Sequence, residues 1–225
     1  MSQTLSAISL GHIDEISSSK NEPDWLKEYR RNSLTVYESL PIETSPLYNK
    51  YTDAKKMDPQ QVSLSISTTD AIPSFLQKRL GELENETCII QIGTNIHKIN
   101  LSDELKSKGL VISSIEDAIK NNPDLVKKSL EASNSKNDKF TALNNAAFNS
   151  GVFIHIPKNL ILEKPIHILT CLSDDGISKF LETLFLQMRV AKEQLFKNYT
   201  LLNQKNNKHI LNYLTQMLLQ MLNLI

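Results

Sequence analysis

The sequence predicts an α+β fold: an N-terminal helical and small α/β region, then the start of a parallel β-helix, then a helical, Leu-rich tail. Three observations predict it. Apolar residues recur at helical spacing early in the chain. Two Ile-His-Ile triplets lie twelve residues apart in the segment 149–170, NSGVFIHIPKNLILEKPIHILT, which is typical of strand, turn and strand. Residues 181–225 contain twelve Leu but no Gly, Pro, Ser or Asp.

The composition is that of an ordinary globular protein, with 40% hydrophobic and 22% charged residues among 225. The formal net charge is +0, so nothing favours a nucleic-acid or anionic-membrane surface. The N-terminus has no signal-like pattern and no apolar run approaches about 18 residues, which predicts a cytoplasmic protein without a membrane span. Cys88 and Cys171 are isolated thiols, expected to be reduced and structural.

Residues 1–20 are rich in Ser and predict a mobile arm with at most one loose turn of helix. Between Pro23 and Pro41, apolar side chains recur at helical spacing and predict an amphipathic helix. Its apolar members are Trp25, Leu26, Tyr29, Leu34, Tyr37 and Leu40. The adjacent Arg30 and Arg31 are interpreted as a solvated face rather than a phosphate clamp.

Residues 21–148 are expected to form the N-terminal helical and α/β domain. Turn residues and apolar periods divide its later part into short elements. The expected strands are 62–66, 88–92, 96–101 and 110–113. The expected helices are 70–80, 114–120, 123–132 and 139–148, with a connection over 41–68 and a linker over 133–138.

Residues 149–180 are expected to form the first β-helix coils, because a coil cannot bury its apolar face alone and normally starts a stack. Alternation places Phe153, His155 and His167 on one face of the two strands. The opposite face is aliphatic throughout and is the expected partner interface. It comprises Val152, Ile154, Ile156, Ile166 and Ile168.

The sequence resembles the SufB/SufD proteins of the SUF iron–sulfur cluster assembly system, and SufD more closely. The resemblance covers about residues 20 to 180. It is carried by EPDWL at 22–26, YRR at 29–31, LP at 40–41, KFTAL at 139–143, NSGVFIHIPK at 149–158 and EKPIHI at 163–168. The last two stretches together are the specific part.

The resemblance implies a right-handed parallel β-helix, pairing with SufB through it, and a C-terminal helical segment that docks on the SufC ATPase in a SufBCD complex. Family members continue for many coils after the position of Phe180, so this chain is expected to be truncated after the start of the β-helix. The residues proposed to handle nascent cluster have no matching position here. We therefore expect no stably bound cofactor, and an iron–sulfur cluster only transiently, at the level of the complex.

The tail, residues 181–225, has two interpretations. Its Leu, Phe and Met residues recur at helical spacing from Leu181 to Ile225, which predicts two helices packed as a hairpin. Alternatively, the tail is translated out of frame, since a one-base shift after Phe180 can be read as Pro-Arg-Asn, as the family continues.

His155, His167 and Cys171 are the weak candidates for a metal site, because neighbouring coils can bring equivalent positions together. Solvated or hydrogen-bonded His and a core Cys are the preferred interpretation. The sequence has no CxxC, HExxH, Walker or GxGxxG motif, so no catalytic or cofactor-binding residue is predicted.

We therefore predict a SufD-like scaffold subunit, not an enzyme, with SufB and SufC homologues as partners and neither nucleic acid nor membrane. The first alternative is a nonfunctional, truncated remnant of such a gene. The second is a β-helix carbohydrate-active enzyme. Such enzymes usually place several carboxylates on one exposed sheet, whereas here only Glu163 lies near the expected strands.

Overall fold

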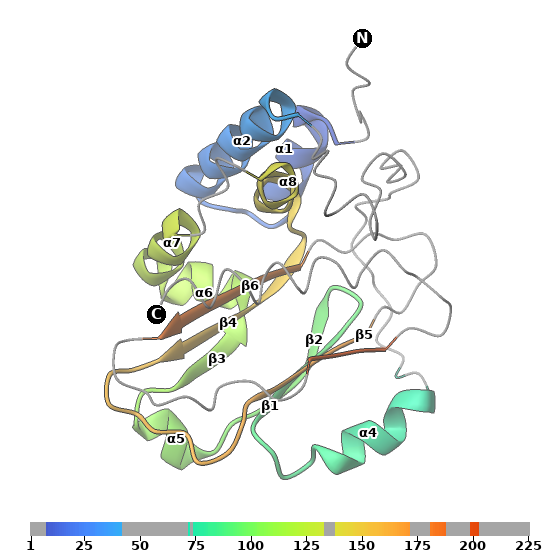
Figure 1. Ribbon diagram of the computed structural model, residues 1–225, viewed down its shortest axis with the longest axis vertical. Coiled ribbons are helices and arrows are strands. Elements are labelled where there is room, and N and C mark those ends of the chain that lie inside the picture. The colour runs from blue at the N-terminus through green and yellow to red at the C-terminus, as the bar shows by residue number, and fades with distance from the viewer. Residues whose placement is uncertain are drawn as a thin grey trace. The chain divides into compact units, whose positions relative to one another are not determined.

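The computed structural model describes residues 8–41, 72, 74–132, 138–171, 181–187 and 199–202. The expected strand over 62–66 and most of the tail lie outside these residues. The chain divides into two compact units. Among the described elements, the first unit contains helices and only the first two residues of one strand, Leu181 and Glu182. The second unit contains the remaining helices and the rest of the strands (Figure 1).

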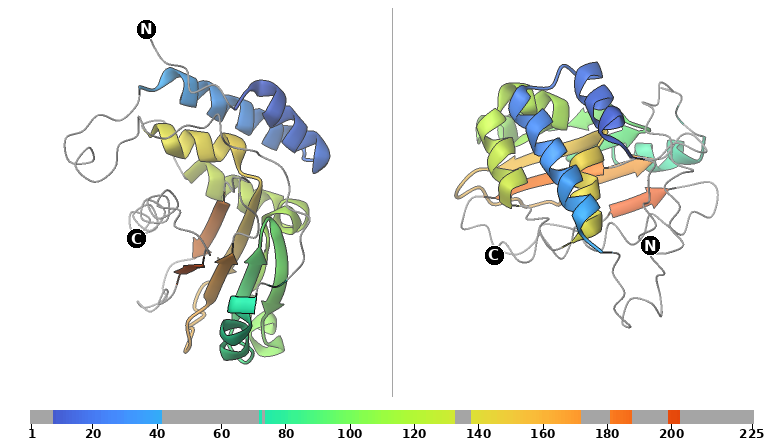
Figure 2. Two further views of the ribbon diagram at one scale, coloured as in Figure 1. Left: turned by 90° about the vertical axis from the view of Figure 1, so that its right-hand side faces the viewer. Right: turned by 90° about the horizontal axis from the view of Figure 1, so that it is seen from above.

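The first unit is built from helices α1 (Leu10–Ser19), α2 (Asp24–Ser39) and α8 (Lys139–Ala147). Helix α8 packs along α2, as two directions of view show (Figure 2). The predicted helices over 23–41 and 139–148 are confirmed. Their shared core consists of Ile8, Ile13, Leu34, Tyr37, Ala142, Leu143, Ala146 and Ala147.

Helix α1 corrects the prediction of a mobile arm over residues 1–20, of which 1–7 lie outside the described residues. Ile13 and Ile16 lie three residues apart on one face of this helix and are buried. At its start, the side chain and backbone N–H of Ser9 both contact His12 Nδ1, at 3.0 and 3.2 Å. This short helix needs few contacts of its own to be stable, because α2 supplies the surface on which it packs.

The second unit contains several short helices. They are η3 (Ser74–Leu76), α4 (Gln77–Glu82), α5 (Asp103–Ser107), α6 (Ile115–Asn121) and α7 (Pro123–Ala132). Helix α6, expected over 114–120, begins after Ser114, whose hydroxyl accepts from Asp117 N–H at 3.0 Å. Within the described residues, the helix expected over 70–80 is η3 followed by α4, which continues past Gly81 to Glu82. None of the described helices is long and apolar enough to cross a membrane.

Two sheets account for the described strands. Their strands are β1 (Cys88–Ile92), β2 (Asn95–Asn100), β3 (Val111–Ser114), β4 (Ser150–Ile156), β5 (His167–Cys171), β6 (Leu181–Gln187) and β7 (Tyr199–Leu202). One sheet has the order β2-β1-β5-β7 and the other β3-β4-β6. The predicted strands over 88–92 and 96–101 are confirmed: β1 and β2 pair antiparallel as a hairpin around Gly93, whose φ of 57° suits glycine.

From β4 onward, successive strands alternate between the two sheets. Strand β5 pairs in parallel with both β1 and β7. The interval from the start of β4 at Ser150 to the start of β6 at Leu181 nearly equals that from β5 at His167 to β7 at Tyr199. At the other border of each sheet the pairing is antiparallel, between β1 and β2 and between β3 and β4.

The core of the second unit lies between the sheets. It joins interior residues of β1, β3, β4 and β5 to the segment between β4 and β5. Its members are Ile89, Leu110, Ile112, Val152, Ile154, Ile156, Leu160, Ile166 and Ile168. The predicted aliphatic face is therefore confirmed as one face. Phe153, on the opposite face, is also fully buried, because α6 packs on β4.

The helix predicted to start at Leu181 is wrong over Leu181–Gln187, which is strand β6 beside β4. A short, largely apolar segment fits either element, and length and periodicity do not separate them. The neighbouring strand decides by supplying backbone hydrogen-bond partners. Residues 199–202, inside the same predicted tail, are strand β7.

We expect Ile154→Ala to reduce the free energy of unfolding by about 2–5 kcal/mol, because it leaves a cavity between the sheets. Ile154 is 0% exposed, whereas Ile161 is 71% exposed. Ile161→Ala is thus the matched control and should change stability by less than about 0.5 kcal/mol. Urea unfolding followed by circular dichroism measures both, and equal losses would contradict this core.

Candidate functional site

The three weak metal candidates do not converge. His155 is on β4 and His167 on β5, which belong to different sheets. Both alternate with interior residues, so each faces away from the shared core. Cys171 shares a strand with His167 but lies at its far end, about 13 Å along it. The part of the chain that the structure describes contains no group of three or more His, Cys, Asp or Glu that could hold a metal.

Burial shifts the pKa of one imidazole and one thiol in these sheets. His155 is half-buried, and desolvation lowers its pKa from the ordinary value of 6.5. Cys88 is buried on β1, and desolvation raises the pKa of its thiol. Its Sγ lies 3.8 Å from the Leu83 carbonyl oxygen, to which the thiol donates. A protonated, enclosed thiol is a structural rather than a reactive cysteine.

The interface predicted on the aliphatic face is not a surface in this structure. Its five side chains are between 0% and 3% exposed, since the opposite sheet covers them. They are Val152, Ile154, Ile156, Ile166 and Ile168.

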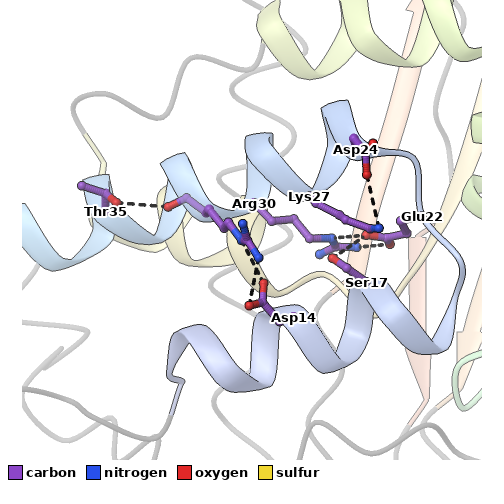
Figure 3. A network of polar contacts seen from close by, with 8 residues as sticks. Asp14, Ser17, Glu22, Asp24, Lys27, Arg30 and Thr35 are labelled. Atoms are coloured by element: carbon purple, nitrogen blue, oxygen red, sulfur yellow. Dashed lines mark hydrogen bonds and ion pairs between the residues drawn. The ribbon is translucent and has the colours of Figure 1, made fainter.

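The most highly organised polar cluster of the first unit is a buried ion pair (Figure 3). Arg30 Nε and Nη2 donate to the two carboxylate oxygens of Glu22, each at 2.7 Å. The two side chains are 0% and 4% exposed. This two-point arrangement matches the planar guanidinium to the carboxylate and gives short, charge-assisted hydrogen bonds.

The remaining polar groups of the pair also have partners. Arg30 Nη1 donates to the Ala146 carbonyl oxygen of α8 at 3.1 Å. The guanidinium carbon lies 3.7 Å from the centroid of the Phe148 ring, a cation–π contact. Ser17 Oγ of α1 donates to Glu22 Oε2 at 3.0 Å. The pair therefore joins α1, α2 and α8.

This arrangement corrects the interpretation of Arg30 and Arg31 as one solvated face. Neighbouring residues on a helix point about 100° apart, so the two side chains separate. Arg31 faces outward and pairs with Asp14 of α1 at 2.9 Å, with side-chain exposures of 54% and 40%. Its hydrogen bond to Asp14 raises the pKa of Arg31. Sequence reasoning missed the buried pair because an isolated Arg-Arg dipeptide gives no sign of which member is enclosed.

Two lysines close the ends of this helical unit. Lys139 Nζ, at the start of α8, donates to the carbonyl oxygens of Tyr37 and Leu40, at 2.5 and 2.7 Å, where α2 ends. It also lies 4.3 Å from the Tyr37 ring centroid, and burial lowers its pKa. Lys20 Nζ donates to the Asn149 carbonyl oxygen at 2.6 Å. These contacts tie the end of α2 to the start of α8, and Lys20 to the residue that precedes β4.

A family model described as SufBD protein N-terminal region matches residues 12–168. Among curated proteins, the chain is similar to an iron–sulfur cluster assembly SufBD family protein of Staphylococcus aureus strain USA300, with 27% identity over 190 residues. A protein of the same description from Staphylococcus saprophyticus is 26% identical over 203 residues. The alignments cover 77% and 83% of this chain, but 40% and 42% of those proteins. The chain thus spans about two fifths of the length of these relatives.

We expect Arg30→Met to reduce the free energy of unfolding by about 3–5 kcal/mol, because it leaves the Glu22 carboxylate buried without its partner. Arg31→Met is the matched control, one residue away, and should change stability little, since its pair with Asp14 is exposed. The double variant Glu22→Leu/Arg30→Met should be more stable than Arg30→Met alone. Chemical denaturation measures all three, and an equal loss for both arginines would contradict the buried pair.

We expect stability to fall as the pH drops below about 6.5, in part because folded His155 resists protonation. The unfolded chain then binds more protons than the folded chain, which favours unfolding as the pH falls toward the folded pKa. His155→Gln should weaken this dependence between pH 7 and the folded pKa of His155, whereas His97→Gln, at an exposed position of β2, should retain it. Thermal unfolding at a series of pH values is the measurement; identical profiles for the two variants would contradict the assignment.

Proposed function

Because this chain belongs to the SufBD family, as the match over residues 12–168 shows, we propose that it is a SufD-like scaffold subunit that supports iron–sulfur cluster assembly by protein–protein interaction. The family match is the observation that carries this proposal, since it includes helices α1, α2 and α8 from His12 onward and most of the described strands. The names of the staphylococcal relatives support the same process.

The proposed architecture is the beginning of a right-handed parallel β-helix. Three features support it: strands alternate between two sheets from β4 onward, β5 pairs in parallel with β1 and β7, and equivalent strands recur at nearly equal intervals. A stack of this kind buries its interior only when neighbouring coils cover one another. The shared core between the sheets fits that requirement.

The proposed partners are a SufB homologue and the SufC ATPase homologue, within a SufBCD complex. The edges beyond β6 and β7 are the natural place for further strands, because the antiparallel strands β2 and β3 border the opposite edges. Charged side chains and a bulge on an edge strand disfavour the pairing of a further strand with it. Strand β2 has both properties, with exposed His97 and Lys98 and an irregular register opposite Ile90 and Gln91.

We propose that the chain has no chemistry and no stably held cofactor of its own, and that the iron–sulfur cluster is cargo of the assembled complex. The proposed compartment is the cytoplasm. The free, buried thiols of Cys88 and Cys171 suit reducing surroundings. A truncated, nonfunctional remnant stays the alternative, favoured by the abrupt change to a Leu-rich composition after residue 180.

Co-expression tests this function. The tagged full chain is produced with SufB and SufC homologues from the same genome, together and one at a time. We expect a stable complex that contains the SufB homologue and survives gel filtration. Arg31→Met should behave as the unmodified chain does, whereas Arg30→Met should reduce the yield of complex by destabilising the helical unit.

Two outcomes would overturn the proposal. The first is a well-folded full chain, with cooperative unfolding, that binds neither homologue. The second is an insoluble chain in the presence of both homologues, which would support the remnant. Sequencing the gene around codon 180 addresses the tail separately, since a single inserted or deleted base should restore a long family-like frame if the tail is out of frame.

A further inference from the structure

One end of the apolar layer between the sheets is polar. Three buried side-chain oxygens there have no hydrogen-bond partner within the described part of the chain: Gln91 Oε1, Ser150 Oγ and Thr170 Oγ1. The three residues are only 1%, 0% and 5% exposed. Buried polar groups are almost always hydrogen-bonded, so three such atoms on strands of the two sheets call for an explanation.

Gln91 and Thr170 face the same way on adjacent strands. They are directly paired in the parallel register of β1 and β5. Each lies two residues beyond an interior residue, Ile89 in β1 and Ile168 in β5, so both side chains face the layer between the sheets. Adjacent strands lie about 4.8 Å apart, which places the two side chains next to each other.

Ser150 approaches from the opposite sheet. It lies two residues before Val152, an interior residue of β4, and therefore faces the same layer. The segment 157–166 carries the chain from the end of β4 back to the start of β5. Ile156 at the end of β4 and Ile166 just before β5 share one cluster with Leu160 of this segment. We infer that the start of β4 and the end of β5 lie at the other end of the layer, which brings Ser150 to the side of Thr170.

The donors and acceptors of this group suit a small polar ligand. Gln91 Nε2 is directed to the Thr94 carbonyl oxygen at 3.4 Å, so Oε1 is left as an acceptor. The hydroxyls of Ser150 and Thr170 can each donate and accept. A buried water typically makes about three hydrogen bonds to groups of this kind.

We propose that this end of the core is a binding site for ordered water, which joins Gln91 and Thr170 of one sheet to Ser150 of the other. The site also fixes the register of β5 on β1. A shift of one residue would turn the Gln91 or Thr170 side chain to the opposite face, into the apolar cluster that contains Leu76, Ile90 and Leu169.

Whether Thr170→Val lowers or raises the stability of the protein tests the site. Thr170→Val is nearly isosteric and removes one partner of the water. We expect the thermal midpoint of the full chain to fall by roughly 2–4 °C. If the hydroxyl were simply unpaired, its removal would relieve an unfavourable burial and raise the midpoint, which would overturn the proposal.

A double-mutant cycle adds a second readout. Ser150→Ala and Thr170→Val lie on different sheets, and neither hydroxyl has a hydrogen bond to the other. We expect their effects to be non-additive, because both change the same water, and additive effects would count against a shared site. Ser113→Ala, at a β3 hydroxyl that bonds the Ser114 carbonyl oxygen at 3.0 Å, is the matched control and should be additive with Thr170→Val.

A high-resolution crystal structure of the unmodified full chain gives the direct answer, independent of how the variants fold. Electron density for a water within hydrogen-bond distance of Thr170 Oγ1 and of either Gln91 Oε1 or Ser150 Oγ supports the site. Continuous apolar packing around these atoms, with no such density, would overturn it.

Discussion

The packing of the helical unit depends on one constraint: the guanidinium of Arg30 is buried. A charge removed from water is tolerated only when its hydrogen bonds are replaced, and here each guanidinium nitrogen has a protein acceptor. Those acceptors come from the α1–α2 connection and from α8, so the packing of all three helices follows from one side chain. The connection itself is tightly specified: Asn21 has a φ of 50°, and Glu22 N–H donates to the Ser17 carbonyl oxygen at 2.9 Å. Asn tolerates this left-handed conformation better than most residues.

The second unit meets a different constraint, because β1, β4 and β5 bury apolar residues on both faces. Ile89 faces the opposite sheet, whereas Ile90 packs toward a separate cluster with Leu76 and Leu83. A single sheet with solvent on one side could not bury both. The chain therefore passes repeatedly from one sheet to the other, and the short helices before β1 cover the outer face. Strand order, core composition and helix placement are consequences of this double burial.

The sequence predicted the elements whose signal is local. Alternation around Val152 and Ile168 and the two short strands over 88–92 and 96–101 are visible within a few residues, and the structure confirms them. The features that the sequence did not predict depend on residues far apart in the chain. Arg30 looked solvent-facing because most arginines are, and Ala146, which accepts one of its hydrogen bonds, lies 116 positions away. The polar end of the core was equally hidden, since Gln91 and Thr170 become neighbours only through the parallel register. The separation of His155 from His167 also required knowing that consecutive strands enter different sheets.

The parallel pairing of β1 with β5 has a consequence for synthesis. Cys88 pairs with His167 and Ile92 with Cys171, so β1 leaves the ribosome long before its partner exists. At about 5–20 residues per second, that interval is roughly 4–16 seconds. During this time β2 can cover one edge of β1 through the local hairpin, while the edge facing β5 stays available to other chains. Nascent molecules of this protein are thus exposed to mispairing at a defined strand, and a chaperone that shields β1 until Cys171 has been synthesised would raise the yield of folded protein.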